Sequence, residues 1–371
     1  MRAIERVLMT ADAVGGVWTY ALDLSRVLGE RGVQVTLAVL GPAPGEWQLA
    51  DVRRLDNVTL YTHPGRLEWM DDPWADVDAD GAWLRALEQE TAPDVVHLNG
   101  YAHGALPWSA PVVVVGHSCV LSWWRAVHGE DAPPSWQRYA DAVQRGIRAA
   151  DAVVAPSQAM LASLQAFYGP LRRAQVIPNG RGCAAPLDGS RSKEPFIFTA
   201  GRLWDDAKNI AAVCAVAPCL PWPVAVAGDI EGPGGRVAEF DGVRCLGRLD
   251  GAQMADCMAR ASIYALPARY EPFGLSALEA AQAGCALVLG DIRSLREIWG
   301  DAALFVAPDD RAMLAAALRR LVDDQPLREE MAHRARARAA AFTATRMADG
   351  YFHIYSELMG EVRSVLSLST V

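Results

Sequence analysis

Two carboxylates eight residues apart stand out in ARYEPFGLSALEAAQAGCALV, a segment that is otherwise almost wholly apolar. Glu279 would be the only charge on a helix of small apolar residues, and removing a carboxylate from water is costly unless a partner compensates. It therefore faces water or a ligand, and it could accept both hydroxyls of a vicinal diol such as a ribose. Glu271 lies in the preceding loop, where an acid favoured by the helix dipole is the alternative. Phe273, Gly274 and Leu275 open the helix with N–H groups that suit a phosphate.

Lysine is rare in this chain, which suggests a specific use for each one. Only Lys193 and Lys208 are lysines among 35 basic residues, so a retained lysine indicates a need for a compact point charge. Lys208 shares the stretch AGRLWDDAKNI with Arg202, between a predicted strand and a predicted helix. A guanidinium and an ammonium together suit a diphosphate. The alternative is a solvated pair that Asp205 and Asp206 partly neutralise.

Glycines and histidines of the first half fall where a parallel sheet exposes its strand ends. Gly15 and Gly16 follow the strand-like ERVLMT and precede a helix, where bare amides favour a phosphate; an ordinary turn is the alternative. The pattern is not G-x-G-x-x-G, which disfavours a nicotinamide cofactor. His117 lies just beyond the buried strand PVVVV, where open α/β sheets collect ligands, or it caps a turn. His97, near the end of DVVHLNG, is a second candidate.

Aromatic side chains gather in the stretch CVLSWWRAVHGEDAPPSW. Trp123, Trp124, His128 and Trp136 offer faces that suit a sugar or an aromatic acceptor. Domain packing is the alternative, and the sequence leaves both interpretations open.

Metal and redox sites are not predicted. Asp76, Asp78, Asp80 and Gly81 imitate a calcium loop, but its twelfth position holds Leu87 instead of a bidentate acid. The seven cysteines are scattered in apolar runs without a C-x-x-C pair, so we expect buried free thiols. We therefore expect neither a metal nor a cofactor.

The elements that must position these residues alternate along the chain. Short apolar runs bounded by Pro, Gly or Asp, such as VQVTLAVL, PDVVHLNG and DAVVAPS, suit parallel strands buried on both faces. Residues 179–195 are rich in Gly, Pro and Ser and are expected to form a linker. The second half restarts the alternation, from FIFTAG to ALFVAP. We therefore predict an α/β protein with two doubly wound domains facing a cleft, and a final amphipathic helix that docks on a domain surface.

Composition limits the function classes. The 371 residues, 51% hydrophobic and 21% charged, suggest two folded domains. A net charge of −9 gives nucleic-acid binding no support. No run approaches the roughly 20 apolar residues of a membrane span, and no signal peptide is visible, so we expect a cytoplasmic protein. Arg138, Arg145 and Arg148 share a helix face, for which solvation is favoured over transient membrane contact.

Taken together, these stretches resemble the retaining glycosyltransferases of family 4, which have the GT-B fold. The resemblance covers nearly the whole chain and is strongest where AGRLWDDAKNI, VAVAGD, LGRLD and RYEPFGLSALEAAQAGCALV follow in the family's order and spacing, with its E-x7-E signature. VIPNG and AAAFTATRMADGYFHIYSEL also resemble it. The resemblance implies an acceptor-side Rossmann-like domain at 1–183, a nucleotide-sugar-binding domain at 184–344, and a helix at 345–371 that crosses back to the first domain.

The resemblance also implies a role for each matching residue. Arg202 and Lys208 would bind the donor diphosphate, and Glu271 would bind hydroxyls of the donor sugar. His117 would lie beside that sugar, near the reacting carbon. The backbone around Arg248 would lie near the base, and Glu279 would bind the ribose. The residues implied to hold the donor are Gly15, Gly16, Arg248, Phe273, Gly274, Leu275 and Glu279.

The implied reaction moves a hexose from a UDP- or GDP-linked sugar to an acceptor hydroxyl, with retention, by same-face attack and without a metal. Arg202, Lys208 and helix dipoles would replace the divalent ion. The acceptor would be a small molecule, a glycan or a lipid-linked molecule, with Trp123, Trp124 and His128 as candidate contacts. Its identity is not predicted, because Ser118 stands where the family often has Asp.

Three alternatives stay open. They are a nucleotide-sugar epimerase, a sugar phosphorylase, and a non-catalytic nucleotide-sugar-binding protein. We expect a monomer or a dimer.

Overall fold

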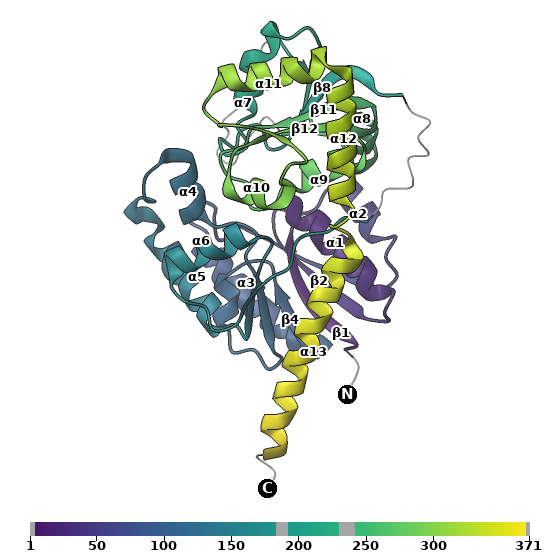
Figure 1. The fold of residues 1–371 in the computed structure, drawn as a ribbon. Coiled ribbons are helices and arrows are strands. Elements are labelled where there is room, and N and C mark those ends of the chain that lie inside the picture. The colour runs from purple at the N-terminus through teal and green to yellow at the C-terminus, as the bar shows by residue number, and fades with distance from the viewer. Residues whose placement is uncertain (1–3, 183–191, 230–241, 369–371) are drawn as a thin grey trace. The chain divides into compact units, whose positions relative to one another are not determined.

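The chain folds into two compact units, each an α/β structure (Figure 1). The structure is a computed structural model that describes residues 4–182, 192–229 and 242–368. Unit 1 combines Met1–Ser122, Asp131–Gly180 and Ala344–Val371, and unit 2 combines Trp123–Glu130 and Arg181–Thr343.

Unit 1 is built on a parallel sheet, which has seven strands within the described residues, in the order β3-β2-β1-β4-β5-β6-β7. Winding reverses between the neighbouring strands β1 and β4, so this pair is the topological switch point, where open α/β sheets bind ligands. The central strands are continuous apolar runs buried on both faces, as in the all-valine β5. The strands are β1 (Arg6–Asp12), β2 (Gln34–Gly41), β3 (Val58–Pro64), β4 (Val95–Leu98), β5 (Val112–Val115), β6 (Ala152–Ala155) and β7 (Ala174–Val176).

Helices cover the sheet of unit 1. The last helix of the chain, yellow in Figure 1, belongs to this unit and packs against the first helix, as predicted for a helix that crosses back. The helices are α1 (Gly16–Gly29), α2 (Glu46–Val52), α3 (Trp74–Thr91), α4 (Val120–His128), α5 (Gln137–Ala149), α6 (Gln158–Tyr168) and α13 (Ala344–Leu368). From Trp123 onward, α4 groups with unit 2.

Unit 2 is a second parallel sheet, with six strands in the described residues, in the order β10-β9-β8-β11-β12-β13. Its switch point lies between β8 and β11. The strands are β8 (Glu194–Ala200), β9 (Val224–Ala227), β10 (Arg244–Cys245), β11 (Ala261–Leu266), β12 (Ala286–Gly290) and β13 (Leu304–Val306). The helices are α7 (Ile210–Val216), α8 (Gly251–Arg260), α9 (Leu275–Gln282), α10 (Arg293–Trp299), α11 (Arg311–Asp323) and α12 (Gln325–Ala339).

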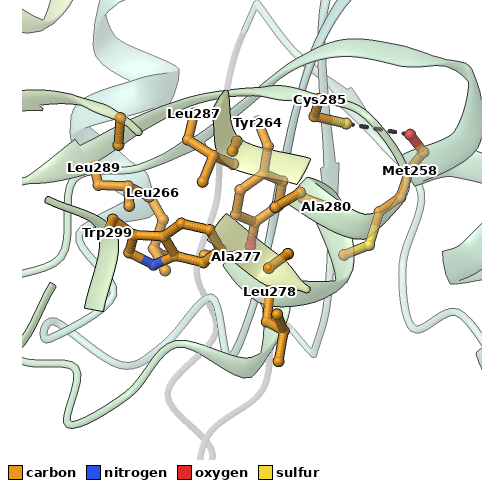
Figure 2. Packing of buried hydrophobic residues seen from close by; sticks show 14 of the residues in the cluster. Met258, Tyr264, Leu266, Ala277, Leu278, Ala280, Cys285, Leu287, Leu289 and Trp299 are labelled. Carbon is orange, nitrogen blue, oxygen red and sulfur yellow. Dashed lines mark hydrogen bonds between the residues drawn. The ribbon is translucent and has the colours of Figure 1, made fainter. Parts of the chain in front are cut away.

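Alternating side chains of the unit 2 strands supply two cores. On one face, Tyr264 and Leu287 pack with Trp299 of α10 and with the alanine face of α9, as Figure 2 shows. On the other face, Ile263 and Val288 pack with α7 and α11. The small residues Ala277 and Ala280 let α9 lie close to the sheet, which fixes the position of the helix that carries Glu279.

The predicted pair of doubly wound α/β halves is confirmed, with differences in detail. The chain passes between units at Gly180–Arg181 and at Thr343–Ala344, whereas the sequence suggested 183/184 and 344/345. The linker expected at 179–195 is too long, because Arg181 forms a parallel bridge with Thr343 and β8 already begins at Glu194. Part of it, 183–191, lies outside the described residues.

Two further expectations need correction. Strands β3 and β7 were not recognised, because both are edge strands with partly exposed side chains in place of an apolar run. The cysteines of the described residues form no disulfide, but only Cys119, Cys214 and Cys285 are buried. Cys219 and Cys245 are exposed, since each lies at the end of a short element. Cys183 lies outside the described residues.

Within the described residues no helix is both long and apolar enough to cross a membrane.

Candidate active site

Three of the predicted site residues of unit 2 lie at its switch point. Arg202 and Lys208 lie in the loop that follows β8, and Glu271 lies in the loop that follows β11. One main-chain and one side-chain hydrogen bond join the two loops: Arg269 N–H donates to the Ala207 oxygen at 2.8 Å, and Asn209 Nδ2 donates to the Pro267 oxygen at 2.9 Å. The carboxyl ends of two neighbouring strands thus present one continuous surface.

Lys208 and Glu271 are in direct contact. Lys208 Nζ lies 2.5 Å from Glu271 Oε2, and both side chains are largely buried. The other oxygen of Glu271 accepts from the N–H of Gly274 at 2.9 Å and from that of Phe273 at 3.4 Å. Glu271 therefore accepts from two amides of the turn that leads into α9. Gly274 has φ +91°, a left-handed conformation that favours glycine, and this turn aims the amides at the carboxylate.

Arg202 is also paired within its own loop. Its Nη2 donates to Asp205 Oδ2 at 2.6 Å, and its guanidinium lies over the ring of Trp204 at 5.3 Å. Asp205 Oδ1 accepts from Trp123 Nε1 at 3.0 Å and from the Ala207 N–H at 3.0 Å. Burial alone would raise the pKa of Asp205, but Arg202, Lys208 and the Trp123 hydrogen bond hold it below its usual value. Asp205 is thus a buried, charged centre that links these side chains.

Glu279 has an ion-pair partner that the sequence did not reveal. Arg181 Nε lies 2.9 Å from Glu279 Oε1, and the side chains are 26% and 24% exposed. Arg181 is held by a hydrogen bond from its N–H to the Phe342 oxygen and by its bridge to Thr343. Glu279, the acid of the apolar helix, is therefore paired with a cation at the helix surface, and its carboxylate stays partly exposed to solvent.

Arg248 lies beyond β10 and is half exposed. Its Nη1 is 3.7 Å from Asp229 Oδ2, and the loops that carry the two residues are joined by a Gly228 N–H to Gly247 oxygen bond of 2.9 Å. This places Arg248 at the carboxyl end of β10, two strands from β8.

In unit 1 the predicted residues also lie at strand ends. Gly15 caps α1 and Gly16 begins it, directly after β1. One turn on, Tyr20 packs edge-on against His117, with ring centroids 4.5 Å apart and an interplanar angle of 71°. His117 follows β5, two strands from β1. The glycine turn and the histidine are therefore connected through the first helix.

A buried polar network surrounds His117. Its Nε2 lies 2.8 Å from Asn99 Oδ1, and His97 Nε2 lies 3.2 Å from the same oxygen. His97 also contacts the hydroxyls of Tyr20 and Tyr355, at 3.1 and 2.5 Å. Burial lowers the pKa of His117 to about 3. Burial, with a smaller effect of His117, lowers the pKa of His97 to about 3 as well. Both rings are therefore neutral near pH 7.

The aromatic cluster predicted for the acceptor lies on α4. Trp124 and His128 have ring centroids 4.6 Å apart, and Trp123 contacts both rings. Trp123 also donates its N–H to Asp205, so this indole packs within unit 2.

Sequence reasoning missed four members of these arrangements, because their partners are distant in the chain. Asp205 had been considered only as a neutralising surface acid, although it is 5% exposed. Arg181, Asn99 and Tyr355 were not singled out; the only signals were an arginine after VIPNG and a polar residue directly after β4. No cluster of three or more His, Cys, Asp or Glu placed to hold a metal occurs among the described residues.

Comparisons with known proteins agree with the fold. Residues 14–182 match the model of Glycosyltransferase Family 4, and residues 189–338 match that of Glycosyl transferases group 1. A glycogen synthase from Mycobacterium tuberculosis is 31% identical over 278 residues, which span 66% of this chain and 64% of the relative. A D-inositol 3-phosphate glycosyltransferase from Kineococcus radiotolerans is 29% identical over 93% of this chain and 91% of its own length.

A solved structure supports the fold assignment. Sucrose-phosphate synthase from Thermosynechococcus elongatus superimposes with a TM-score of 0.77 at 19% identity, covering 96% of this chain and 100% of that one. With its two parallel-sheet halves and its returning terminal helix, the chain belongs to the glycosyltransferases of the GT-B fold that join a family 4 half to a group 1 half.

Proposed function

We propose that this glycosyltransferase moves a hexose from a UDP- or GDP-linked sugar to an acceptor hydroxyl, with retention of anomeric configuration and without a metal ion. The observation that carries the proposal is the Lys208–Glu271 contact at the switch point of unit 2. It brings the cation assigned to the diphosphate within hydrogen-bond distance of the acid assigned to the sugar. A cytoplasmic location is part of the proposal.

The physical argument concerns the leaving group. Negative charge grows on the diphosphate as the glycosidic bond breaks, and fixed donors aimed at that charge are a major catalytic resource. Lys208 and Arg202 lie in one loop whose hydrogen bonds fix it against the β11 loop. Two fixed cations supply charge that a divalent ion supplies elsewhere. In unit 1, the amides at Gly15 and Gly16 would add donors at a helix N-terminus.

Retention by same-face attack fits the role of Glu271. Retaining hydrolases use a free carboxylate nucleophile about 5 to 5.5 Å from a second carboxyl group. Glu271 instead accepts bonds from Lys208 and from the amides of Gly274 and Phe273. A carboxylate engaged in this way is suited to bind sugar hydroxyls, and it leaves the diphosphate oxygen to take the proton of the acceptor.

The relatives suggest which acceptors to test. They are named for glycogen and for D-inositol 3-phosphate, so the acceptor panel includes α-glucans, inositol phosphates, simple sugars and lipid-linked sugars. A thermal-shift screen of UDP- and GDP-hexoses selects the donor, and the panel is then assayed with that donor. Formation of an α-linked product from an α-linked donor supports the proposal.

Other outcomes identify the alternatives. Turnover of donor alone to an isomeric nucleotide sugar indicates an epimerase, and turnover that needs inorganic phosphate indicates a phosphorylase. Donor binding with no product across the panel favours a binding protein.

Lys208→Ala tests the leaving-group role. A charge-assisted hydrogen bond contributes about 1.5 to 3 kcal/mol, so turnover should fall roughly tenfold or more. Arg260→Ala is the matched control. Arg260 pairs with Glu194 beside the same two strands, β8 and β11, but at their amino-terminal ends, away from the loops that carry Lys208 and Glu271. Wild-type turnover in Lys208→Ala would contradict the assignment.

A further inference from the structure

Asn99 joins His97 and His117 to the centre of the unit 1 sheet. Its Oδ1 contacts Nε2 of both His117 and His97. Its Nδ2 donates to the main-chain oxygen of Thr10 at 2.6 Å, and its main-chain N–H donates to Thr10 Oγ1 at 2.8 Å. Asn99 directly follows β4 and Thr10 lies in β1, so hydrogen bonds between the two strands of the switch point fix the side-chain amide of Asn99.

These partners determine the direction of each hydrogen bond. The Thr10 oxygen can only accept, so the amide nitrogen of Asn99 faces it and the amide oxygen faces the imidazoles. Because an amide oxygen also only accepts, His117 Nε2 must carry a proton and donate it. A neutral imidazole has a single N–H, which leaves Nδ1 of His117 with the lone pair.

The second histidine extends the network to the last helix. His97 Nε2 lies 3.2 Å from the same oxygen and 3.1 Å from the Tyr20 hydroxyl, which can donate or accept, so Asn99 alone does not set the tautomer of His97. His97 Nδ1 contacts the hydroxyl of Tyr355, 2.5 Å away on α13. Tyr355 is fully buried, and burial raises its pKa, so the hydroxyl keeps its proton.

The His117 ring is held in position as well as in tautomer. One side is fixed by the Asn99 bond, and the ring packs edge-on against Tyr20. Within the described part of the chain, His117 Nδ1 has no hydrogen-bond partner in the protein. The side chain is only partly buried, so this nitrogen is the polar group with which His117 can meet a ligand.

We propose that Asn99 is the positioning residue of His117: it fixes the Nε2–H tautomer and leaves Nδ1 as the acceptor for a substrate hydroxyl. The hydroxyl belongs to the donor sugar or to the acceptor, an identity that rests on the proposed function. The tautomer itself does not, since it follows from the contacts of unit 1 alone.

Histidine side-chain nitrogen NMR tests the tautomer without any substrate. The protein is labelled with ¹⁵N-histidine, and the His117 signals among the seven histidines are assigned by their loss in His117→Gln. We expect His117 near pH 7 to carry its proton on Nε2, with Nδ1 unprotonated. In Asn99→Ala the His117 signals should move to a mixture of tautomers. A wild-type His117 protonated on Nδ1, or a spectrum unchanged by Asn99→Ala, would overturn the proposal.

Two further variants separate positioning from folding. Asn57 is the matched control, because its amide also donates to main-chain oxygens in unit 1, those of Ser25 and Val33, at 2.9 and 3.0 Å. Asn57→Ala should leave the His117 tautomer unchanged. Asn99→Asp keeps an acceptor toward both imidazoles and should retain the Nε2–H of His117, even if the alanine variant folds poorly. Loss of that tautomer in Asn99→Asp would count against the proposal.

Kinetics with the selected donor connect the tautomer to turnover. Asn99→Ala should lower kcat about 10- to 100-fold, because a misplaced catalytic group costs that much, whereas Asn57→Ala at matched stability should not. A rise in donor KM assigns the hydroxyl to the donor sugar, and a rise in acceptor KM assigns it to the acceptor. An unchanged kcat and KM beside a changed tautomer would refute the substrate contact. Failure to find any donor would affect the proposed function but not the NMR result.

Discussion

Lys208 and Glu271, 63 residues apart in the chain, form an ion pair with 2.5 Å between Nζ and Oε2. The sequence had assigned them to different parts of a donor, one to the diphosphate and the other to the sugar. In the structure each is the partner of the other. A diphosphate that reaches Lys208 therefore competes with an internal carboxylate, which keeps the amides of Gly274 and Phe273 when the pair separates.

Glu271→Gln should uncouple nucleotide binding from transfer. The amide oxygen of glutamine can still accept from the Gly274 N–H, but the negative charge that competes for Lys208 is gone. We expect UDP or GDP to bind as tightly as to the wild type or more tightly, while hexose transfer falls roughly tenfold or more. Isothermal titration calorimetry and a product assay measure the two effects. Weaker nucleotide binding would mean that Glu271 does not compete for Lys208.

Glu279 and Arg181 can be tested as a pair. If Glu279 binds the ribose, Glu279→Gln should weaken binding of the free nucleotide by roughly tenfold, because a hydrogen bond to a charged group is lost. Arg181→Gln should change it less, since the carboxylate remains. A partly exposed ion pair contributes about 0 to 1 kcal/mol, so both variants should stay folded. Equal nucleotide affinity in Glu279→Gln and the wild type would assign Glu279 to the ion pair alone.

Asp205 should make stability depend on pH in the acid range. Its pKa in the folded state lies below the unfolded value of about 3.9. Its stabilisation is therefore present above about pH 4 and is lost as the pH falls through the folded-state pKa. Asp205→Asn should lower the free energy of unfolding by about 1 to 3 kcal/mol at pH 7, and the difference should narrow near pH 3. Urea denaturation at both pH values measures it.

The exposed neighbour of Asp205 provides the control. Asp206→Asn should leave the unfolding free energy within about 0.5 kcal/mol of the wild type. A constant gap between Asp205→Asn and the wild type from pH 7 to pH 3 would contradict the charged state assigned to Asp205.

Lys193 should make the free energy of unfolding depend on pH in the alkaline range. Its Nζ donates to the Met258 oxygen at 3.0 Å and lies 3.6 Å from Cys285 Sγ, and burial lowers its pKa. The unfolded chain then binds more protons than the folded one between the folded-state pKa and about 10.4, so stability rises with pH in that window. Relative to Lys193→Met, wild-type stability should therefore rise between pH 7 and pH 10. Urea denaturation of both proteins measures this. A difference in unfolding free energy between wild type and Lys193→Met that stays constant from pH 7 to pH 10 would exclude a lowered pKa of Lys193.

Much of the fold follows from the sequence because buried parallel strands are continuous apolar runs. β5 and β6 are of this kind, and each falls where it was expected. The edge strand β3 contains Thr59, Tyr61 and His63 and keeps several side chains in solvent, so it lacks that pattern. Lys193 was placed in a linker on composition, although its ammonium is partly buried against α8 and the residue before β12.

From the sequence, the candidate site could be located only to the loops that follow the predicted strands. Loops after β8 and β11 were identified, but the pairing of Lys208 with Glu271 depends on the adjacency of those two strands in the sheet. The Arg181–Glu279 and Tyr355–His97 contacts join residues 98 and 258 positions apart. Local patterns do not encode such partners, which depend on how the chain returns to the same sheet.

The bridge between Arg181 and Thr343 brings together the two points at which the chain enters and leaves most of unit 2. Nearly all of unit 2 enters and leaves through two neighbouring residues, so it has the topology of a domain inserted into a host. Such an insert can be cut out without leaving distant ends to reconnect, and its own ends can be joined by a short linker to permit circular permutation. Unit 2 is accordingly a candidate for transfer to another host as one piece, while unit 1 keeps its own sheet.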